Sequence, residues 1–191
     1  MMKRSTMPMM IAASLGMALG LFACNGARTL PVASAPAGTL PVVGQVAPAF
    51  RLVSNEGTEV ALEDMGGRWV VLYFYPKNFT GGCTVEAQNF QRDLERFERL
   101  GAVVVGVSVD SVDSHREFCT KEGLTFRLLA DTDGAVSASY GSLNERNGNR
   151  RSARNTFVID REGRIAQVFT GVDPSAHSEQ VLVALEKLQS R

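Results

Sequence analysis

The chain has 191 residues, of which 45% are hydrophobic and 21% are charged, and this suits one globular domain with a sizeable core plus an additional segment. The 20 basic and 20 acidic residues balance, and the only notable basic run is the pair Arg150-Arg151, so nucleic-acid binding has no electrostatic support. Three cysteines and two isolated histidines, with no Cys-x-x-Cys pair, exclude a disulfide scaffold and argue against a zinc site.

The N-terminal segment has the pattern of an export signal. Lys3 and Arg4 precede an apolar run over 7–23, and LFAC follows at 21–24. A basic start, an apolar core and a small residue before the cut describe a secretory signal. LFAC resembles the lipobox of bacterial lipoproteins, which implies a signal peptide over 1–23 and a lipid on Cys24. A cut after ASA at 33–35 and an uncleaved membrane anchor remain open.

Each of these alternatives places the folded part outside the cytoplasm, and we expect a periplasmic lipoprotein that is anchored to the membrane. Residues 24–44 are rich in Pro, Ala, Gly and Ser without a repeat, which predicts a flexible tether. The folded domain is then expected over 45–191.

The first strongly predicted element of this domain is the apolar run WVVLYF at 69–74, which is typical of a strand buried on both faces. After the loop PKNFTGG, the pattern predicts a helix over 84–100 that is capped by Thr84 and ended by Gly101. Its inner stripe is expected to contain four apolar residues: Val85, Phe90, Leu94 and Phe97.

A second buried strand is predicted over 102–109, followed by a helix over 112–122 that Ser111 caps and Gly123 closes. The remaining predicted elements are, in chain order, a short strand at 128–129, a turn at 133–134, a short helix at 135–140, a β-hairpin with strands at 156–159 and 165–169, and an amphipathic helix at 176–189. Strands that alternate with helices, followed by a hairpin and a helix, indicate an α/β domain with a mixed central sheet flanked by helices. The thioredoxin-like fold matches this order best.

The loop before the first helix contains the candidate reactive residue. Cys83 lies where a loop meets a helix, and a thiol becomes a strong nucleophile only as the thiolate. The partial positive charge of the helix start, together with an arginine from elsewhere, favours that form. Thr80 offers a hydroxyl beside the sulfur, Pro76 restricts the loop, and Gly81-Gly82 permit close approach of a small ligand. The pattern indicates a thiolate that attacks a small oxygen species; a structural cysteine under a loop is the alternative.

These residues resemble a known family. Pro76, Thr80 and Cys83 match the P-x-x-x-[T/S]-x-x-C signature of the peroxiredoxins, and YFYPKNFTGGCTVEAQNF resembles their bacterioferritin-comigratory-protein, or PrxQ, branch. The similarity continues through GVSVDSVDSHREF, LLAD and RNTFVID, so it covers about residues 45–190.

The resemblance implies a thiol peroxidase with a thioredoxin-like fold and no metal or organic cofactor. In the family's mechanism Cys83 attacks a peroxide and becomes a sulfenic acid, while Thr80, Arg154 and the Cys83 backbone N–H hold the peroxide oxygens. Glu86 either helps to order this network or faces solvent near the helix start. We expect a small peroxide as substrate, a thioredoxin-like dithiol as reductant, and a monomer.

The sequence departs from many relatives at two positions. Gly81 stands where they have a proline, and Gln88 stands where they have a second cysteine in the same helix. Cys119, on the next predicted helix, is similar to the resolving cysteine of a subset of this branch, which implies a Cys83–Cys119 disulfide that forms after local unfolding. If Cys119 is only a buried apolar residue, the enzyme is a one-cysteine peroxidase resolved by an external thiol.

Other functions of the same fold lack the residues that they require. A thiol–disulfide oxidoreductase needs C-x-x-C, where this chain has Glu86, and a copper chaperone needs C-x-x-x-C, where it has Ala87. A non-catalytic, membrane-anchored binding module has no need of Pro76, Thr80, Cys83 and Arg154, all of which are present. A thiol peroxidase is therefore the function that the sequence favours.

Overall fold

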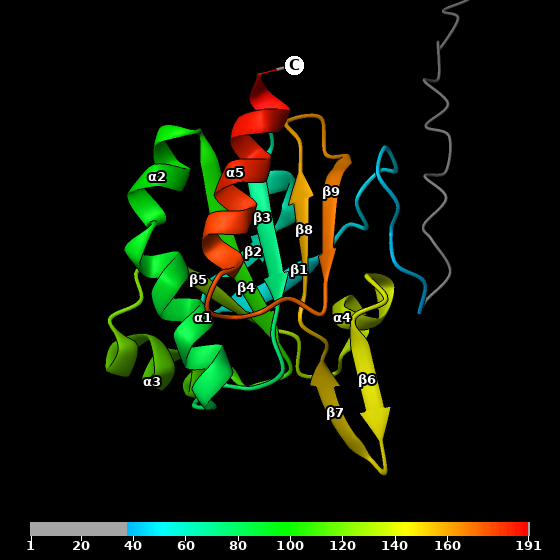
Figure 1. Cartoon of the computed structure of the whole chain (residues 1–191). Helices are drawn as coiled ribbons and strands as arrows, with labels where there is room; N and C mark the ends of the chain where they lie inside the picture. The colour runs from blue at the N-terminus through cyan, green and yellow to red at the C-terminus, as the bar shows by residue number, and fades with distance from the viewer. Residues whose placement is uncertain (1–37, 191) are drawn as a thin grey trace, which may run out of the picture. The chain divides into compact units, whose positions relative to one another are not determined.

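The computed structural model describes residues 38–190, all of which belong to one compact unit (Figure 1). The predicted signal peptide, the lipidation candidate Cys24 and most of the predicted tether lie outside the described residues. Within 38–190, no helix combines the length and apolar character that crossing a membrane requires.

The core of the domain is a seven-stranded sheet with the order β2-β1-β5-β4-β3-β8-β9. Its strands are β1 (Arg51–Ser54), β2 (Glu59–Ala61), β3 (Trp69–Phe74), β4 (Ala102–Ser108), β5 (Arg127–Ala130), β8 (Asn155–Ile159) and β9 (Ile165–Thr170). The β3–β4 and β4–β5 pairs are parallel, and the other pairs are antiparallel. The predicted mixed sheet is confirmed.

Side chains of β3 alternate between two buried clusters because successive residues of a strand point to opposite faces. Val71 and Tyr73 belong to the cluster beneath α1 (Gly81–Arg92), α2 (Leu94–Arg99), α3 (Val112–Glu122) and α5 (His177–Gln189), whereas Leu72 and Phe74 belong to the cluster on the other face. In Figure 1, α1, α2 and α5 lie on one side of the sheet, and α4 (Ala135–Ser139) lies on the other.

The predicted helix over 84–100 is wrong in three respects. α1 begins three residues earlier with Thr80 rather than Thr84 at the N-cap position, and the segment breaks at Asp93 into α1 and α2. Val85 is 41% exposed, while Glu86 is 1% exposed. The reason is the helical period: Glu86 lies four residues before the buried Phe90 and shares its face, but Val85 lies five residues before it.

The other predicted elements agree more closely. α3 has both predicted ends, because the Ser111 hydroxyl accepts a hydrogen bond from the Ser114 N–H (3.3 Å) and Gly123 closes the helix with φ +68°. The β8–β9 hairpin and α5 also occupy their predicted ranges to within one or two residues. Residues 38–44, at the end of the predicted tether, contact the domain, since Gly38 N–H donates to Ala138 O (2.9 Å) and Gly44 N–H to Ile165 O (2.7 Å).

Four strands and one short helix were not predicted. β1, β2, β6 (Leu143–Arg146) and β7 (Asn149–Ser152) are short and partly or largely exposed, and the 3-10 helix η1 (Leu62–Met65) follows β2. Their sequences lack the clean apolar alternation that predicts strands. The β6–β7 turn did carry a signal, since the dipeptide Asn147-Gly148, with φ +52° and +74°, is a strong hairpin former.

Candidate active site

Strand register brings the two ends of the predicted motif together. β3 and β8 are antiparallel, and Phe74 at the end of β3 pairs with Asn155 at the start of β8. The loop after β3 leads to Cys83 in the first turn of α1, and the residue before β8 is Arg154. Two segments about 70 positions apart in the chain therefore meet at one edge of the sheet.

Arg154 contacts Cys83 directly. Its Nη2 lies 3.3 Å from Cys83 Sγ, and its Nη1 donates to Glu86 Oε2, one turn further along α1. The Cys83 residue is 2% exposed and the Glu86 side chain is fully buried, while the Arg154 side chain is 17% exposed. The guanidinium thus separates the sulfur from a buried carboxylate and places positive charge beside the thiol.

Glu86 was left open by the sequence, and the structure places it inside the site. Burial raises the pKa of its carboxyl to about 7, and Arg154 acts against this rise. Its Oε1 is buried without a partner among the described residues. The signal that identifies its orientation is its spacing of three from Cys83 and four from Phe90.

Thr80 and Pro76 lie on the same loop as Cys83. Thr80 is the N-cap residue of α1, and its hydroxyl donates to the carbonyl of Lys77 (3.0 Å) rather than bonding to the sulfur. Pro76 is partly buried at the start of the loop. The two residues fix the entry of the chain into α1, and the Thr80 oxygen is left with its lone pairs to accept a bond.

Gly82 lies against Arg154 and Pro174. A Cβ atom at this position would lie 3.4 Å from Arg154 Nη2 and 3.5 Å from Pro174 Cγ, whereas a Cβ at Gly81 would meet nothing within 4 Å. Pro174 belongs to the segment between β9 and α5, and its carbonyl accepts a hydrogen bond from Asn89 of α1 (3.1 Å). A side-chain atom at Gly82 would therefore make ordinary contacts, and neither glycine is required by a steric clash.

Cys119 lies on a different helix in different surroundings. It is 6% exposed in α3, it is a free thiol, and burial raises its pKa to about 11. Its neighbour Phe118 is fully buried and packs edge-on against Phe79 of the Cys83 loop, with ring centroids 5.1 Å apart. The structure therefore brings Thr80, Cys83 and Arg154 to one loop–helix junction and keeps Cys119 on the adjacent helix.

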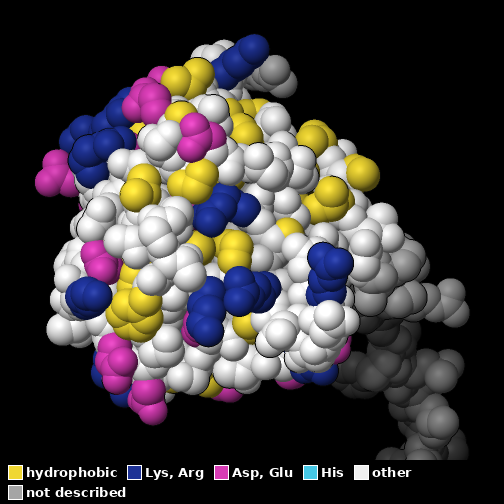
Figure 2. Space-filling view, turned by 60° about the horizontal axis from the view of Figure 1, so that its bottom comes forward, with side chains coloured by type: hydrophobic (Ala, Val, Ile, Leu, Met, Phe, Trp, Pro, Cys, Tyr) yellow, Lys and Arg dark blue, Asp and Glu magenta, His cyan; other side chains and the backbone are white. Residues whose placement is uncertain are grey.

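Figure 2 shows the end of the molecule at which this junction lies. Lys and Arg side chains occupy the middle of the face among hydrophobic ones, and most Asp and Glu side chains lie toward its edge. Two exposed apolar side chains of the junction are Phe79 (44%) and Val85 (41%). Within the described residues, no group of three His, Cys, Asp or Glu side chains is arranged to hold a metal ion.

Comparison with known proteins identifies similar chains over most of the length. The family model for the AhpC/TSA family matches residues 43–168. Peroxiredoxin Bcp of Xanthomonas campestris is 39% identical over 134 residues, which are 68% of this chain and 84% of that protein. Peroxiredoxin Bcp of Bacillus subtilis is 37% identical over 153 residues, 78% of this chain and 98% of that protein.

Solved structures agree with these sequence matches. Peroxidoxin BcpB of Mycobacterium tuberculosis superposes with a TM-score of 0.73 at 31% identity, over 77% of this chain and 97% of that one. A cysteine-to-serine mutant of PrxQ from Xylella fastidiosa gives 0.75 at 33% identity, over 80% and 99%. A structure of the X. campestris bacterioferritin comigratory protein, described with its alkyl peroxide reduction activity, gives 0.68 at 37% identity, over 72% and 90%.

Proposed function

The chain belongs to the AhpC/TSA family as a peroxiredoxin of the Bcp/PrxQ branch, and we propose that Cys83 is the thiol with which it reduces hydrogen peroxide and organic hydroperoxides. The family and the thioredoxin-like fold predicted from the sequence are confirmed. The observation that carries the assignment of Cys83 is the contact of its sulfur with the Arg154 guanidinium, 3.3 Å away, at the start of α1.

In the first step the Cys83 thiolate attacks one peroxide oxygen. An S–O bond forms as the O–O bond breaks, the alcohol or water leaves after taking up one proton, and Cys83 becomes a sulfenic acid. Arg154 and the backbone N–H groups at the helix start stabilise the negative charge that moves onto the leaving oxygen, since preorganised donors act most strongly where charge develops. Thr80 supplies a hydroxyl on the same loop, and Glu86 orients Arg154.

In the second step the Cys119 thiol attacks the sulfenic sulfur, a Cys83–Cys119 disulfide forms, and water leaves. This step requires opening of the fold, because the cysteines lie on separate helices and a disulfide needs Cα atoms about 4.4–6.8 Å apart. Burial raises the pKa of Cys119 to about 11, so the closed fold offers little thiolate there. Opening exposes the thiol and removes this obstacle.

A dithiol protein of the thioredoxin type then returns two electrons, which restores both thiols of the peroxiredoxin and leaves the donor as a disulfide. The alkyl peroxide reduction activity of the X. campestris relative supports organic hydroperoxides as substrates here. The second candidate is a one-cysteine cycle, in which an external thiol attacks the sulfenic acid; the burial of Cys119 is the observation that favours it.

The test combines two single variants with the full-length protein. We expect Cys83→Ser to abolish peroxide consumption. We expect peroxide to convert the wild-type chain into a faster-migrating monomer on non-reducing gels, and we expect Cys119→Ser to prevent this change. When a dithiol reductase is the reductant, Cys119→Ser should react once with peroxide and then stop. Undiminished consumption by Cys83→Ser would refute the assignment of the attacking thiol, and sustained turnover by Cys119→Ser would establish the one-cysteine cycle.

We also propose that the domain is exported and held at a membrane by lipid on Cys24, on the grounds of the LFAC sequence after the apolar run 7–23. The expected mature chain begins at Cys24 and carries the mass of the lipid. Mass spectrometry of the protein isolated from its native membrane tests this. An unmodified Cys24, or an N-terminus near residue 36, would contradict the lipid anchor while leaving export intact.

A further inference from the structure

A buried asparagine joins the loop of Cys83 to the helix of Cys119. Asn78 is 3% exposed and lies five residues before Cys83. Its Nδ2 donates to Ser114 Oγ (2.9 Å) and to His115 Nδ1 (3.1 Å), both in the first turns of α3. Its Oδ1 accepts from the hydroxyl of Tyr75 (2.8 Å), at the end of β3. We call these four residues, Tyr75, Asn78, Ser114 and His115, the Asn78 cluster.

Every hydrogen of the Asn78 amide has an acceptor in this cluster. His115 is fully buried, and its Nε2 lies 3.2 Å from the carbonyl of Leu129 in β5, an acceptor only. Nε2 therefore carries the ring proton, and Nδ1 accepts from Asn78. The backbone N–H of Asn78 donates to Asp110 Oδ2 (2.9 Å) in the segment before α3. The cluster thus links the Cys83 loop, the start of α3 and β5 through satisfied buried bonds.

At the opposite end of α3 the side-chain hydrogen bonds are exposed to solvent, although Leu124, just after the helix, is buried in the apolar cluster. Gln88 of α1 donates to Glu122 (2.8 Å), and Gln91 bonds to Thr125 just after the helix (2.7 and 3.1 Å); all these bonds are exposed to solvent. Exposed polar contacts compete with water and contribute little, whereas loss of a buried partner is costly. Cys119 lies between the two ends, one turn after His115.

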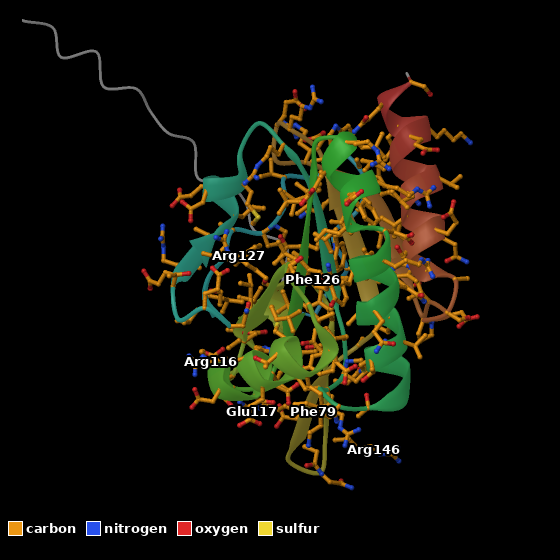
Figure 3. The ribbon with its side chains drawn as sticks, turned by 90° about the vertical axis from the view of Figure 1, so that its left-hand side faces the viewer. Phe79, Arg116, Glu117, Phe126, Arg127 and Arg146 are labelled. Carbon is orange, nitrogen blue, oxygen red and sulfur yellow. The ribbon has the colours of Figure 1, made fainter. Side chains whose placement is uncertain are left out.

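The remaining contact between the loop and α3 is aromatic and depends on the same loop conformation. Phe79 follows Asn78 with φ +59°, a left-handed backbone that is unfavourable for a bulky residue. Its ring packs on Phe118, the residue before Cys119, and Lys121 Nζ lies 5.5 Å from the ring centroid. Figure 3 shows Phe79 at the end of the molecule where Glu117 of α3 is also labelled. The bonds of Asn78 fix the backbone immediately before Phe79 and so help to hold this strained conformation.

We propose that Asn78 is a positioning residue that holds α3, the helix of Cys119, in the closed fold. It so sets how often α3 opens in the resting enzyme and exposes Cys119 for disulfide formation. Only the purpose of this opening, formation of the Cys83–Cys119 disulfide, rests on the proposed function. That Asn78 keeps α3 closed is a property of the reduced fold. We expect the opening to begin at the end of α3 after Cys119, where the hydrogen bonds to α1 are exposed to solvent and only a short segment, with the buried Leu124, has to be released.

The test measures alkylation of Cys119 in the reduced full-length protein, without peroxide, by iodoacetamide labelling and peptide mass spectrometry. Loss of a buried hydrogen-bonding side chain leaves its partners unsatisfied, so Asn78→Ala should raise the labelling rate of Cys119 about tenfold. The matched control is Gln91→Ala, which removes exposed bonds between α1 and Thr125 at the other end of α3 and should raise the labelling rate of Cys119 by less than about threefold. Equal rates in the two variants would overturn the proposal.

Amide exchange in β4 separates opening of α3 from unfolding of the whole domain. In Asn78→Ala the β4 amides should exchange at a rate close to that of the wild type. A rise in β4 exchange by the same factor as the Cys119 labelling would mean that Asn78 stabilises the fold in general, and it would also overturn the proposal. Because no peroxide is used, absence of the Cys83–Cys119 disulfide would refute the proposed second step and leave this result unaffected.

A second variant adds a readout that general destabilisation does not produce. Asn78→Asp places a carboxylate against His115 Nδ1, which favours a protonated imidazole; the other titratable groups facing that ring are Tyr75 and Asp110. Protection of Cys119 should then be strong at pH 5, where the ring is charged, and weak at pH 8, where two acceptors face each other. The wild type should show no such gain of protection at pH 5 after correction for the reagent's reaction with free thiol. A pH-independent ratio of variant to wild type would contradict the cluster's role.

Discussion

The two cysteine regions of this peroxiredoxin are both buried, but they differ in what surrounds the sulfur. Cys83 lies in the first turn of α1 and touches the guanidinium of Arg154, which Glu86 holds from one turn further along the helix. Cys119 lies within α3 and belongs to the same apolar cluster as Cys83, and burial raises the pKa of its thiol to about 11. The closed fold therefore presents one thiol beside positive charge and stores the other in a nonpolar environment.

This difference divides the work between two conformations of one chain. The closed fold assembles the groups that favour a thiolate at Cys83, and these are side chains from two distant segments. In the proposed cycle the open fold is needed only for Cys119, whose helix bonds the Asn78 cluster at its start and makes exposed hydrogen bonds at its end. The comparison predicts that variants near Cys83 change the reaction with peroxide, and that variants near Cys119 change the opening.

The largest expected effect is that of Arg154→Ala on the reaction with peroxide. Removal of the guanidinium deletes a preorganised donor beside the reacting atoms, and loss of one such donor typically slows a reaction by about 10²–10³-fold. Stopped-flow competition between the variant and a reference peroxidase measures the second-order rate constant. Arg151→Ala is the control, because Arg151 is exposed on β7 and should change the rate by less than about twofold. Similar rates for both variants would show that the guanidinium of Arg154 does not assist the reaction of Cys83 with peroxide.

The sequence predicts the elements whose signals are local. α3 has both of its predicted ends because Ser111 and Gly123 carry their capping chemistry themselves. The start of α1 was placed three residues too late because Thr80 and the glycines resemble a loop, and in the structure Thr80 is the N-cap residue of α1. β1, β2 and the polar β6–β7 hairpin were missed because their stability comes from pairing rather than from an apolar pattern.

The site shows the same limit. The proximity of Arg154 to Cys83 followed from a resemblance, and its physical cause is the β3–β8 register, which no local pattern encodes. The burial of Glu86 was available from its spacing to Phe90, but its partner was not. The four residues of the Asn78 cluster come from two stretches of the chain that lie more than 30 positions apart, so no single stretch of sequence indicates it.

The next effect concerns acid, because each region contains one buried histidine. His115 lies in the Asn78 cluster. His177 bonds Thr156 of β8 (2.8 Å), two residues after Arg154. Burial lowers the pKa of each ring to about 4. The unfolded chain binds protons near pH 6.5 and the folded chain only near 4, so stability is lost as the pH falls through that window.

Between pH 7 and pH 5 each histidine should cost about 2 kcal/mol of unfolding free energy, measured by urea denaturation at the two pH values. His115→Gln and His177→Gln should each reduce the loss between pH 7 and pH 5 by about 2 kcal/mol, whatever their effect at pH 7; the raised pKa of Glu86 acts in the opposite direction in every variant. If His115→Gln leaves the difference between the two pH values unchanged, the ring is not buried in its neutral form, and the description of the Cys119 region is wrong.

The smallest effect separates the two regions by backbone strain alone. Gly123 ends α3 with φ +68°, and Gly163 occupies the β8–β9 turn with φ +77°; a Cβ at either position would meet nothing within 4 Å. Alanine at each should therefore cost about 1 kcal/mol of unfolding free energy through its left-handed backbone and nothing through contact.

Gly123→Ala weakens the end of α3 from which we expect opening, so alkylation of Cys119 and disulfide formation should each accelerate about fivefold, with an unchanged rate of peroxide attack at Cys83. Gly163→Ala should lower the urea midpoint by as much as Gly123→Ala does. It should leave the rates of Cys119 alkylation and of disulfide formation unchanged, because its turn lies outside α1 and α3. If the two variants accelerated the disulfide equally, opening would follow global stability rather than the end of α3, and the two cysteine regions would not behave as separate units.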